Sequence, residues 1–292
     1  MGTKIQGLMG LVKFKITSAV VVTATAGYIL AQGRLESLVF LPMLGLLFVA
    51  FGSAALNHLQ EHDLDGQMER TRHRPLSSGA LKPWQVLLIA AALVVSGSAL
   101  LYFFGGEAPF VLGLLALFWY NGIYTPLKRR TAWAIIPGGL IGSLPPLIGW
   151  SISGLPLWDV KILAFCFFMF IWQVPHFWLL SIRYSQDYAK AGFPMVTSRF
   201  SEAQLSRIIY SWILSTAVAA LLMPLYGGVN YQLTAVLLIA AGIWVVALER
   251  QLLGVSRANV DYRLAFNRLN IYALMVVMLI SLDELLFAFP GA

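Results

Sequence analysis

Residues 37–60 read SLVFLPMLGLLFVAFGSAALNHLQ, and residues 61–76 continue EHDLDGQMERTRHRPL. The first stretch carries no Lys, Arg, Asp or Glu side chain. As a helix it is long enough to cross a hydrocarbon core of about 30 Å, which requires roughly 20 apolar residues. The second stretch concentrates carboxylates, arginines and histidines directly after it. This pairing of an apolar helix with a polar end predicts an all-α polytopic membrane protein.

The composition of the whole chain agrees with lipid as its solvent. Of the 292 residues 59% are apolar and 11% are charged, and the mean hydropathy is +0.77. A soluble domain is about a quarter charged, so these charges are too few to cover a soluble surface. The single cysteine, Cys166, excludes an intramolecular disulfide and a thiolate metal cluster. With no internal repeat and no linker, residues 1–292 are predicted to form one domain.

Several stretches of the chain are apolar and long enough to cross a bilayer. They lie near residues 14–32, 37–60, 84–104, 108–124, 132–153, 160–184, 207–226, 231–249 and 268–289. We therefore expect about nine transmembrane helices around a central cavity that opens to the cytoplasmic side. The fourth stretch is short, which leaves eight as the alternative count.

The basic residues support this count and orient the chain. With the N-terminus in the cytoplasm, every Lys and Arg except Arg34 and Lys161 falls in or beside a cytoplasmic segment. Such retention of positive charge is the usual topology signal, so the net charge of +7 indicates orientation and not nucleic-acid binding. The N-terminus shows no cleavable signal pattern. We expect a multi-pass protein of a prokaryotic inner membrane, with its active site facing the cytoplasm.

The first candidate site lies where the second span ends. Asn57, Glu61 and Asp65 are spaced by four, so a helix places them on one face. Two carboxylates and an amide form an oxygen ligand set that suits Mg²⁺. Arg70 and Arg74 follow with the same spacing and offer the donors that a diphosphate requires. The alternative is a solvated, charge-mixed loop that serves only topology.

A second group of cations follows the fourth span. Tyr124 and a proline precede Lys128, Arg129 and Arg130. Three cations at a membrane boundary are often a topology signal alone. They are equally able to reach the phosphates of a ligand from a second helix, and both interpretations stay open.

The third group belongs to the sixth span. His176, Arg183 and Asp187 lie at i, i+7 and i+11, which places them near one face if the helix continues. His176 also follows Trp172 by one turn, in an aromatic setting that favours a pocket for a large flat ligand. A structural, hydrogen-bonded histidine is the alternative.

These motifs resemble a known family. Asn57-x₃-Glu61-x₃-Asp65 followed by Arg70 and Arg74 resembles the first motif of the UbiA intramembrane prenyltransferase superfamily. Residues 124–131, 145–150, 172–177 and 187–195 resemble its heme O synthase branch most. The chain departs from the pattern in three places. Glu61 replaces the usual Asp, Asp187 is the only carboxylate of the second acidic motif, and Lys13-Phe14 replaces a Lys-Pro pair.

The resemblance implies a transfer of a farnesyl group from farnesyl diphosphate to a vinyl group of heme b, which is a substrate and not a permanent cofactor. One or two Mg²⁺ ions would serve as cofactor. The implied metal ligands are Asn57, Glu61, Asp65 and Asp187, and these four with Lys128 are the implied catalytic residues. The implied diphosphate-binding residues are Arg70, Arg74, Tyr124, Lys128 and Arg129, and the implied heme-binding residues are Trp172, His176 and Arg183.

The resemblance also leaves alternatives. A related prenyltransferase acting on 4-hydroxybenzoate, a quinone precursor or a chlorin would share the first motif. A membrane transporter is the more distant alternative. If heme is the acceptor, heme A synthase or a terminal oxidase assembly is the expected partner.

Overall fold

The computed structural model of the protein describes residues 2–254 and 261–288. Within these residues nine helical segments are long and apolar enough to cross a membrane. The principal helices are α1 (Gly2–Leu11), α2 (Phe14–Gln32), α3 (Phe40–Asp65), α4 (Pro83–Leu100), α5 (Glu107–Phe118), α6 (Thr125–Lys128), α7 (Ile135–Ser151), α8 (Val160–Arg183), α9 (Ser185–Lys190), α10 (Glu202–Ala220), α11 (Leu222–Leu225), α12 (Gln232–Glu249) and α13 (Tyr262–Phe287). The predicted all-α membrane fold and its nine spans are confirmed.

The fourth span is longer than its apolar stretch predicted. It runs from Glu107 to Lys128, because a π-helix, η3 (Trp119–Tyr124), joins α5 to α6 without a break. The predicted stretch ended at residue 124, the last residue of η3, because the proline and lysine of α6 that follow it interrupt the apolar pattern.

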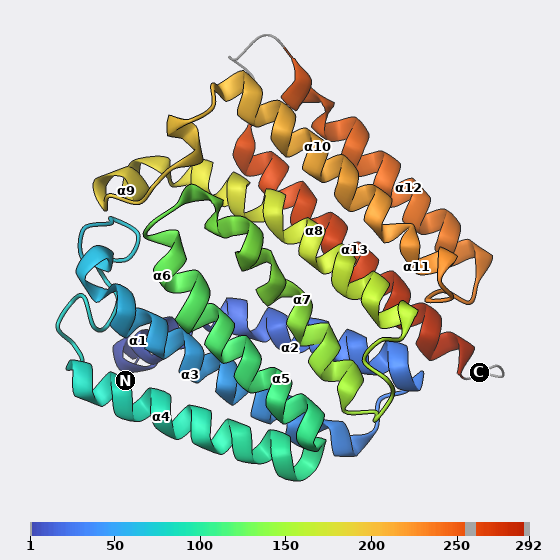
Figure 1. Ribbon diagram of the computed structural model, residues 1–292, viewed down its shortest axis with the longest axis horizontal. Coiled ribbons are helices and arrows are strands. Elements are labelled where there is room, and N and C mark those ends of the chain that lie inside the picture. The colour runs from blue at the N-terminus through green and yellow to red at the C-terminus, as the bar shows by residue number, and fades with distance from the viewer. Residues whose placement is uncertain (1, 255–260, 289–292) are drawn as a thin grey trace.

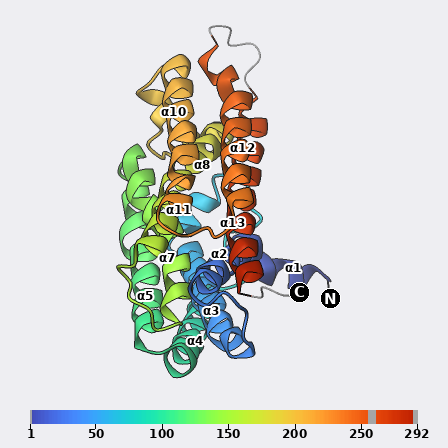
Figure 2. The same cartoon turned by 90° about the vertical axis from the view of Figure 1, so that its right-hand side faces the viewer.

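The helices form a closed arrangement in which α2, α7, α8 and α13 each pack against the next, and α13 packs back against α2. Helices α3 and α4 pair on one flank, and α10 and α12 on the other (Figure 1). Seen after a quarter turn, α5 and α7 lie towards one side of the molecule and α12 and α13 towards the other (Figure 2). Figure 1 also shows α1, α6, α9 and the loop after α3 at one end of the bundle. These segments, which were all predicted to be cytoplasmic, thus lie together.

Helices α2 and α7 cross at backbone contact. A Cβ atom added to Gly149 would lie 1.7 Å from the Ala24 carbonyl oxygen, and one added to Gly27 would lie 2.0 Å from the Pro146 carbonyl oxygen. Only glycine permits such an approach, which is how membrane helices gain close packing where water gives no driving force. This crossing fixes α2, and with it the start of the chain, against the centre of the bundle.

The crossing gives a first prediction. Gly149→Ala should lower the thermal denaturation midpoint in detergent, because the added methyl group overlaps the backbone of α2. Overpacking of this kind lowers the free energy of unfolding by about 1–3 kcal/mol or more. Gly10→Ala is the matched control, since a Cβ there has nothing within 4 Å. Equal midpoints for the two variants would show that the helices separate without cost.

Candidate active site at the polar end of helix α3

Helix α3 carries Asn57, Glu61 and Asp65 on one buried face, with relative exposures of 0%, 4% and 1%. The intervening Asp63 lies on the exposed side and pairs with Arg129, whose Nη2 is 2.9 Å from Asp63 Oδ1. Since burial of a carboxylate is costly unless a cation compensates it, the buried face indicates a site and not a solvated loop.

Two predicted cations compensate the two buried carboxylates. Lys128 Nζ lies 2.5 Å from Glu61 Oε1, and Arg74 Nη1 lies 2.6 Å from Asp65 Oδ2. Both cations are about one-fifth exposed, so they lie at the boundary of the buried face. The structure thus brings together residues from both halves of the predicted metal and diphosphate site.

A third cation comes from the N-terminal segment. Lys13 Nζ donates to Asn57 Oδ1 at 2.6 Å and to the Tyr120 hydroxyl at 3.2 Å. Burial lowers the pKa of Lys13 to about 7, with further contributions from the charges of Arg74 and Lys128. The sequence alone marked Lys13 only as part of a departure from a family pattern, so the site has one residue more than was predicted.

The π-helix η3 contributes two tyrosine rings next to this site. Tyr120 and Tyr124 stack with centroids 5.8 Å apart, and Thr125 Oγ1 accepts a hydrogen bond from Asn57 Nδ2 at 3.0 Å. Single π-helical turns are uncommon and often occur at functional sites. Here the wide turn places Tyr124 one turn and Tyr120 two turns before Lys128, and Thr125 at the start of α6 orients the Asn57 amide.

The oxygens of the site retain capacity for a cation. Asp65 Oδ1 is buried without a hydrogen-bond partner, and Glu61 Oε1 is buried with only the Lys128 ion pair. Among the described residues, no group of three His, Cys, Asp or Glu side chains forms a metal centre by itself. These ligands therefore fit Mg²⁺, which takes one or two carboxylates and completes its shell with water and phosphate oxygens.

The segment after α8 does not continue the helix. Helix α8 ends at Arg183, Tyr184 leaves helical geometry at φ −111° and ψ 26°, and Asp187 lies on the separate helix α9. The prediction that His176, Arg183 and Asp187 share one helix face is therefore wrong. Arg183 is exposed, with its guanidinium 5.2 Å from the centroid of the Tyr184 ring.

Helix α9 is instead tied to the loop that follows α3. The Arg70 backbone N–H donates to Asp187 Oδ2 at 3.3 Å, and its guanidinium donates to the Tyr188 hydroxyl at 3.3 Å. The same guanidinium lies 4.7 Å from the centroid of the Tyr184 ring. Arg70 thus ties the loop after α3 to helix α9. Within the described residues no hydrogen bond joins Asp187 to the side chains of Asn57, Glu61 or Asp65.

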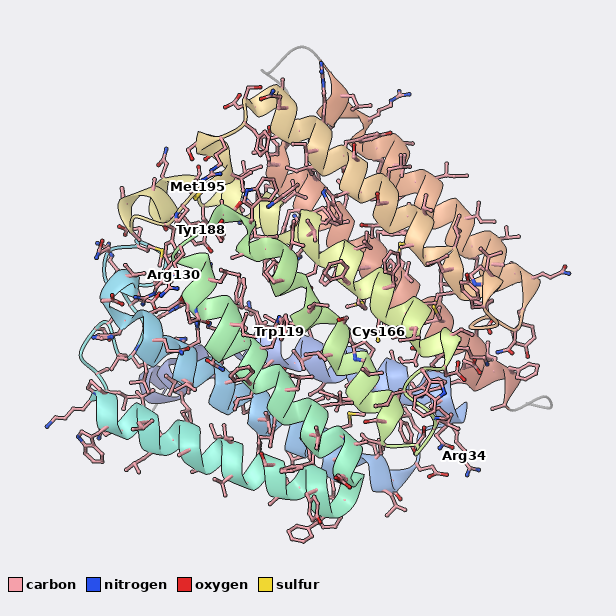
Figure 3. The ribbon with its side chains drawn as sticks, viewed as in Figure 1. Arg34, Trp119, Arg130, Cys166, Tyr188 and Met195 are labelled. Carbon is pink, nitrogen blue, oxygen red and sulfur yellow. The ribbon has the colours of Figure 1, made fainter. Side chains whose placement is uncertain are left out.

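A pocket lies beside Lys128, and none of Asn57, Glu61 and Asp65 lines it. Its volume is about 100 Å³, and its lining includes Tyr124, Lys128, Phe177 and Tyr188. The Tyr124 and Phe177 rings stack with centroids 5.9 Å apart. Figure 3 shows Tyr188, Arg130 and Met195 at this end of the molecule, with Arg34 at the opposite end. The pocket is lined by the chain neighbours of His176 and Asp187, and not by these two residues themselves.

His176 lies between α8 and α13. Its Nδ1 donates to Asn270 Oδ1 at 2.7 Å, and its ring lies 4.8 Å from Trp172 and 4.9 Å from Phe266, centroid to centroid. Because an amide oxygen only accepts, this bond leaves a lone pair on Nε2. Asn270 and Phe266 were missed from the sequence, although an asparagine inside a span is itself a signal.

Comparison with known proteins identifies the family. Residues 20–281 match the UbiA prenyltransferase family. A protoheme IX farnesyltransferase of Geobacter sulfurreducens is 35% identical over 261 residues, which cover 89% of this chain and 93% of the relative. One from Xanthomonas oryzae pv. oryzae is 37% identical over 261 residues, which cover 84% of this chain and 86% of that one.

Solved structures show the same fold at low identity. A UbiA homologue from Archaeoglobus fulgidus bound to GPP and Mg²⁺ superposes with a TM-score of 0.70 at 15% identity, covering 96% of this chain and 99% of that one. A digeranylgeranylglyceryl phosphate synthase gives a TM-score of 0.72 at 12% identity, covering 97% and 99%. With the matched residues spanning most of the chain, we conclude that this protein is an enzyme of the UbiA prenyltransferase family.

Proposed function

We propose that the enzyme transfers the farnesyl group of farnesyl diphosphate to a vinyl group of heme b, giving heme O, with Mg²⁺ as its cofactor. The names of its relatives support heme as the acceptor. The observation that supports the chemistry most is the buried face of α3, where two carboxylates with unused oxygens lie against Lys128 and Arg74.

Asn57, Glu61 and Asp65 are the residues that would hold the metal. A bound ion would neutralise the negative charge of the diphosphate leaving group. Arg74 and Lys128 lie beside these ligands and take up the remaining negative charge. A second Mg²⁺ ion would have Asp187 as its only carboxylate ligand. The ligands therefore favour a single ion, bound at α3.

The reaction needs ionisation of the allylic carbon–oxygen bond, with the electron pair leaving on the diphosphate. The π-electrons of a heme vinyl group then form the new carbon–carbon bond, and water adds to the resulting cation with loss of a proton. The stacked faces of Tyr120, Tyr124 and Phe177 lie next to Lys128. Aromatic faces stabilise a nearby cation, so these rings are suited to shelter the farnesyl cation from water.

For heme, the proposal assigns His176 as the contact to iron and Trp172 as a flanking ring. The Nε2 lone pair of His176 and the support from Asn270 support this assignment. Arg183 is exposed and able to meet a heme propionate at the membrane surface. We further propose a prokaryotic inner membrane, a cytoplasmic N-terminus and site, and delivery of the product to heme A synthase or a terminal oxidase assembly.

The proposal is tested by incubating purified protein with heme b, farnesyl diphosphate and Mg²⁺ and then measuring the mass of the heme. We expect a hydroxyethylfarnesyl adduct, its loss on chelation of the metal, and its return when Mg²⁺ is restored, because the buried carboxylates and the diphosphate are all anionic and need a cation between them. Equimolar 4-hydroxybenzoate is the competing acceptor. Prenylation of that acceptor in place of heme, or turnover that persists in excess chelator, would contradict the proposal.

A further inference from the structure

Lys13 has a backbone conformation that is rare for its residue type. Its φ of 50° and ψ of 47° place it in the left-handed region, and it is the only non-glycine residue with positive φ in the described part of the chain. This conformation costs about 1–2 kcal/mol for a residue with a Cβ. Leu11 and Val12 before it are buried, at 0% and 7% exposure. The strain is therefore maintained by packing, and observed strain of this kind favours a functional role.

The strained turn between α1 and α2 delivers the ammonium group to the centre of the site. Lys13 Nζ contacts the Asn57 oxygen on α3 and the Tyr120 hydroxyl on η3, and lies 5.8 Å from the centroid of the Tyr120 ring. No other residue of the first two helices is recorded in a side-chain hydrogen bond to the site among the described residues. The N-terminal segment thus contributes one group to the active site.

The charges around the site do not balance. Two buried carboxylates, Glu61 and Asp65, each pair with their own cation, Lys128 and Arg74. Lys13 is the further cation, and its recorded hydrogen-bond partners among the described residues are neutral. The ammonium of Lys13 is partly buried, and a charge removed from water without a counter-charge is costly. The Lys13 ammonium is therefore suited to bind an anionic ligand.

The metal and Lys13 also compete for one atom. An Mg²⁺ ion bound to Asn57 Oδ1 would lie about 2.1 Å from that oxygen. The ammonium is 2.6 Å from the same oxygen, so the two cations would be within about 5 Å of each other and would repel. The lysine side chain is flexible, and a diphosphate oxygen beside the metal offers the ammonium a charged partner in exchange for the amide.

We propose that Lys13 is a diphosphate-binding residue that holds the Asn57 oxygen and moves to a diphosphate oxygen when the metal takes Asn57. This inference rests on the proposed function, because it requires a metal and a diphosphate at α3. It has a distinctive consequence. Removing the ammonium strengthens binding of the metal alone and weakens binding of the diphosphate, whereas a residue with a purely structural role would weaken both.

The test uses the full-length protein in detergent with Mn²⁺ as the metal probe and inorganic pyrophosphate as the anion probe. Lys13→Gly removes the ammonium and fits the positive φ without strain, and Lys13→Met removes the charge with similar length. We expect Mn²⁺ alone, measured by its paramagnetic resonance signal, to bind several-fold tighter to both variants. Pyrophosphate in the presence of Mn²⁺ should bind about 10–100-fold weaker, as for the loss of one charge-assisted hydrogen bond.

Lys15→Met is the matched control, since Lys15 is exposed two residues later, and it should bind both probes like the parent. Unchanged or equally weakened binding of the two probes in Lys13→Gly, with a thermal midpoint no lower than that of the parent, would overturn the assignment of Lys13 alone. A parent protein that binds neither Mn²⁺ nor pyrophosphate would overturn the proposed function itself.

Discussion

Replacing Asp65 by alanine is expected to abolish farnesyl transfer while the protein stays folded in the membrane. Asp65 is 1% exposed, its Oδ1 has no partner, and its Oδ2 accepts from Arg74 at 2.6 Å. The substitution removes a metal ligand and leaves Arg74 without its counter-charge. We expect a loss of about 10²–10³-fold in kcat, comparable to removal of one preorganised group that stabilises developing charge.

The control for this experiment is Asp63→Ala, two residues earlier on the same helix. The Asp63 side chain is 53% exposed and pairs with Arg129 on the outer side, so its loss should leave the rate near that of the parent. Asp65→Asn serves as a second variant, since it retains the volume and tests the charge alone. A rate close to that of the parent in both Asp65 variants would contradict the assignment of a metal site to α3.

Much of this site follows from local sequence, because helix periodicity needs no tertiary information. The spacing of four between Asn57, Glu61 and Asp65 predicted a common face, and the structure buries all three. The transmembrane spans could also be predicted from local sequence. The length of apolar sequence that a span needs, about 20 residues, is set by the bilayer and not by neighbouring helices. The predicted roles of these residues in catalysis remain predictions.

The remainder depends on which helices meet. A cation in a sequence does not specify its partner, and three of the predicted cations lie in unforeseen places. Arg70 lies against Tyr184 and Tyr188, Arg129 pairs with Asp63, and Arg183 extends from the end of α8. The contacts of Lys13 with Asn57 and of His176 with Asn270 join residues 44 and 94 positions apart. No local pattern contains such pairings.

His176→Ala is expected to weaken heme binding and to shift the heme absorption spectrum, because it removes an imidazole whose Nε2 lone pair is available for iron. Asn270 holds the opposite nitrogen at 2.7 Å, and such supporting hydrogen bonds change metal affinity by about 10–100-fold when they are removed. We therefore expect Asn270→Leu to raise the heme dissociation constant by about this factor, and His176→Ala to raise it by at least as much. Titration of the purified protein with heme b measures both.

A structural histidine would give a different pattern, which separates the two explanations. His176 packs between Trp172 and Phe266, so its loss also leaves a cavity that lowers heme affinity without any bond to iron. His176→Gly with added imidazole resolves this, because free imidazole that enters the cavity restores the parent spectrum only if the ring binds iron. His62→Ala, an exposed histidine on α3, should leave the spectrum unchanged. A parent-like spectrum in His176→Gly without imidazole would end the assignment of His176 to iron, and the contact to Asn270 would then be a bond between helices alone.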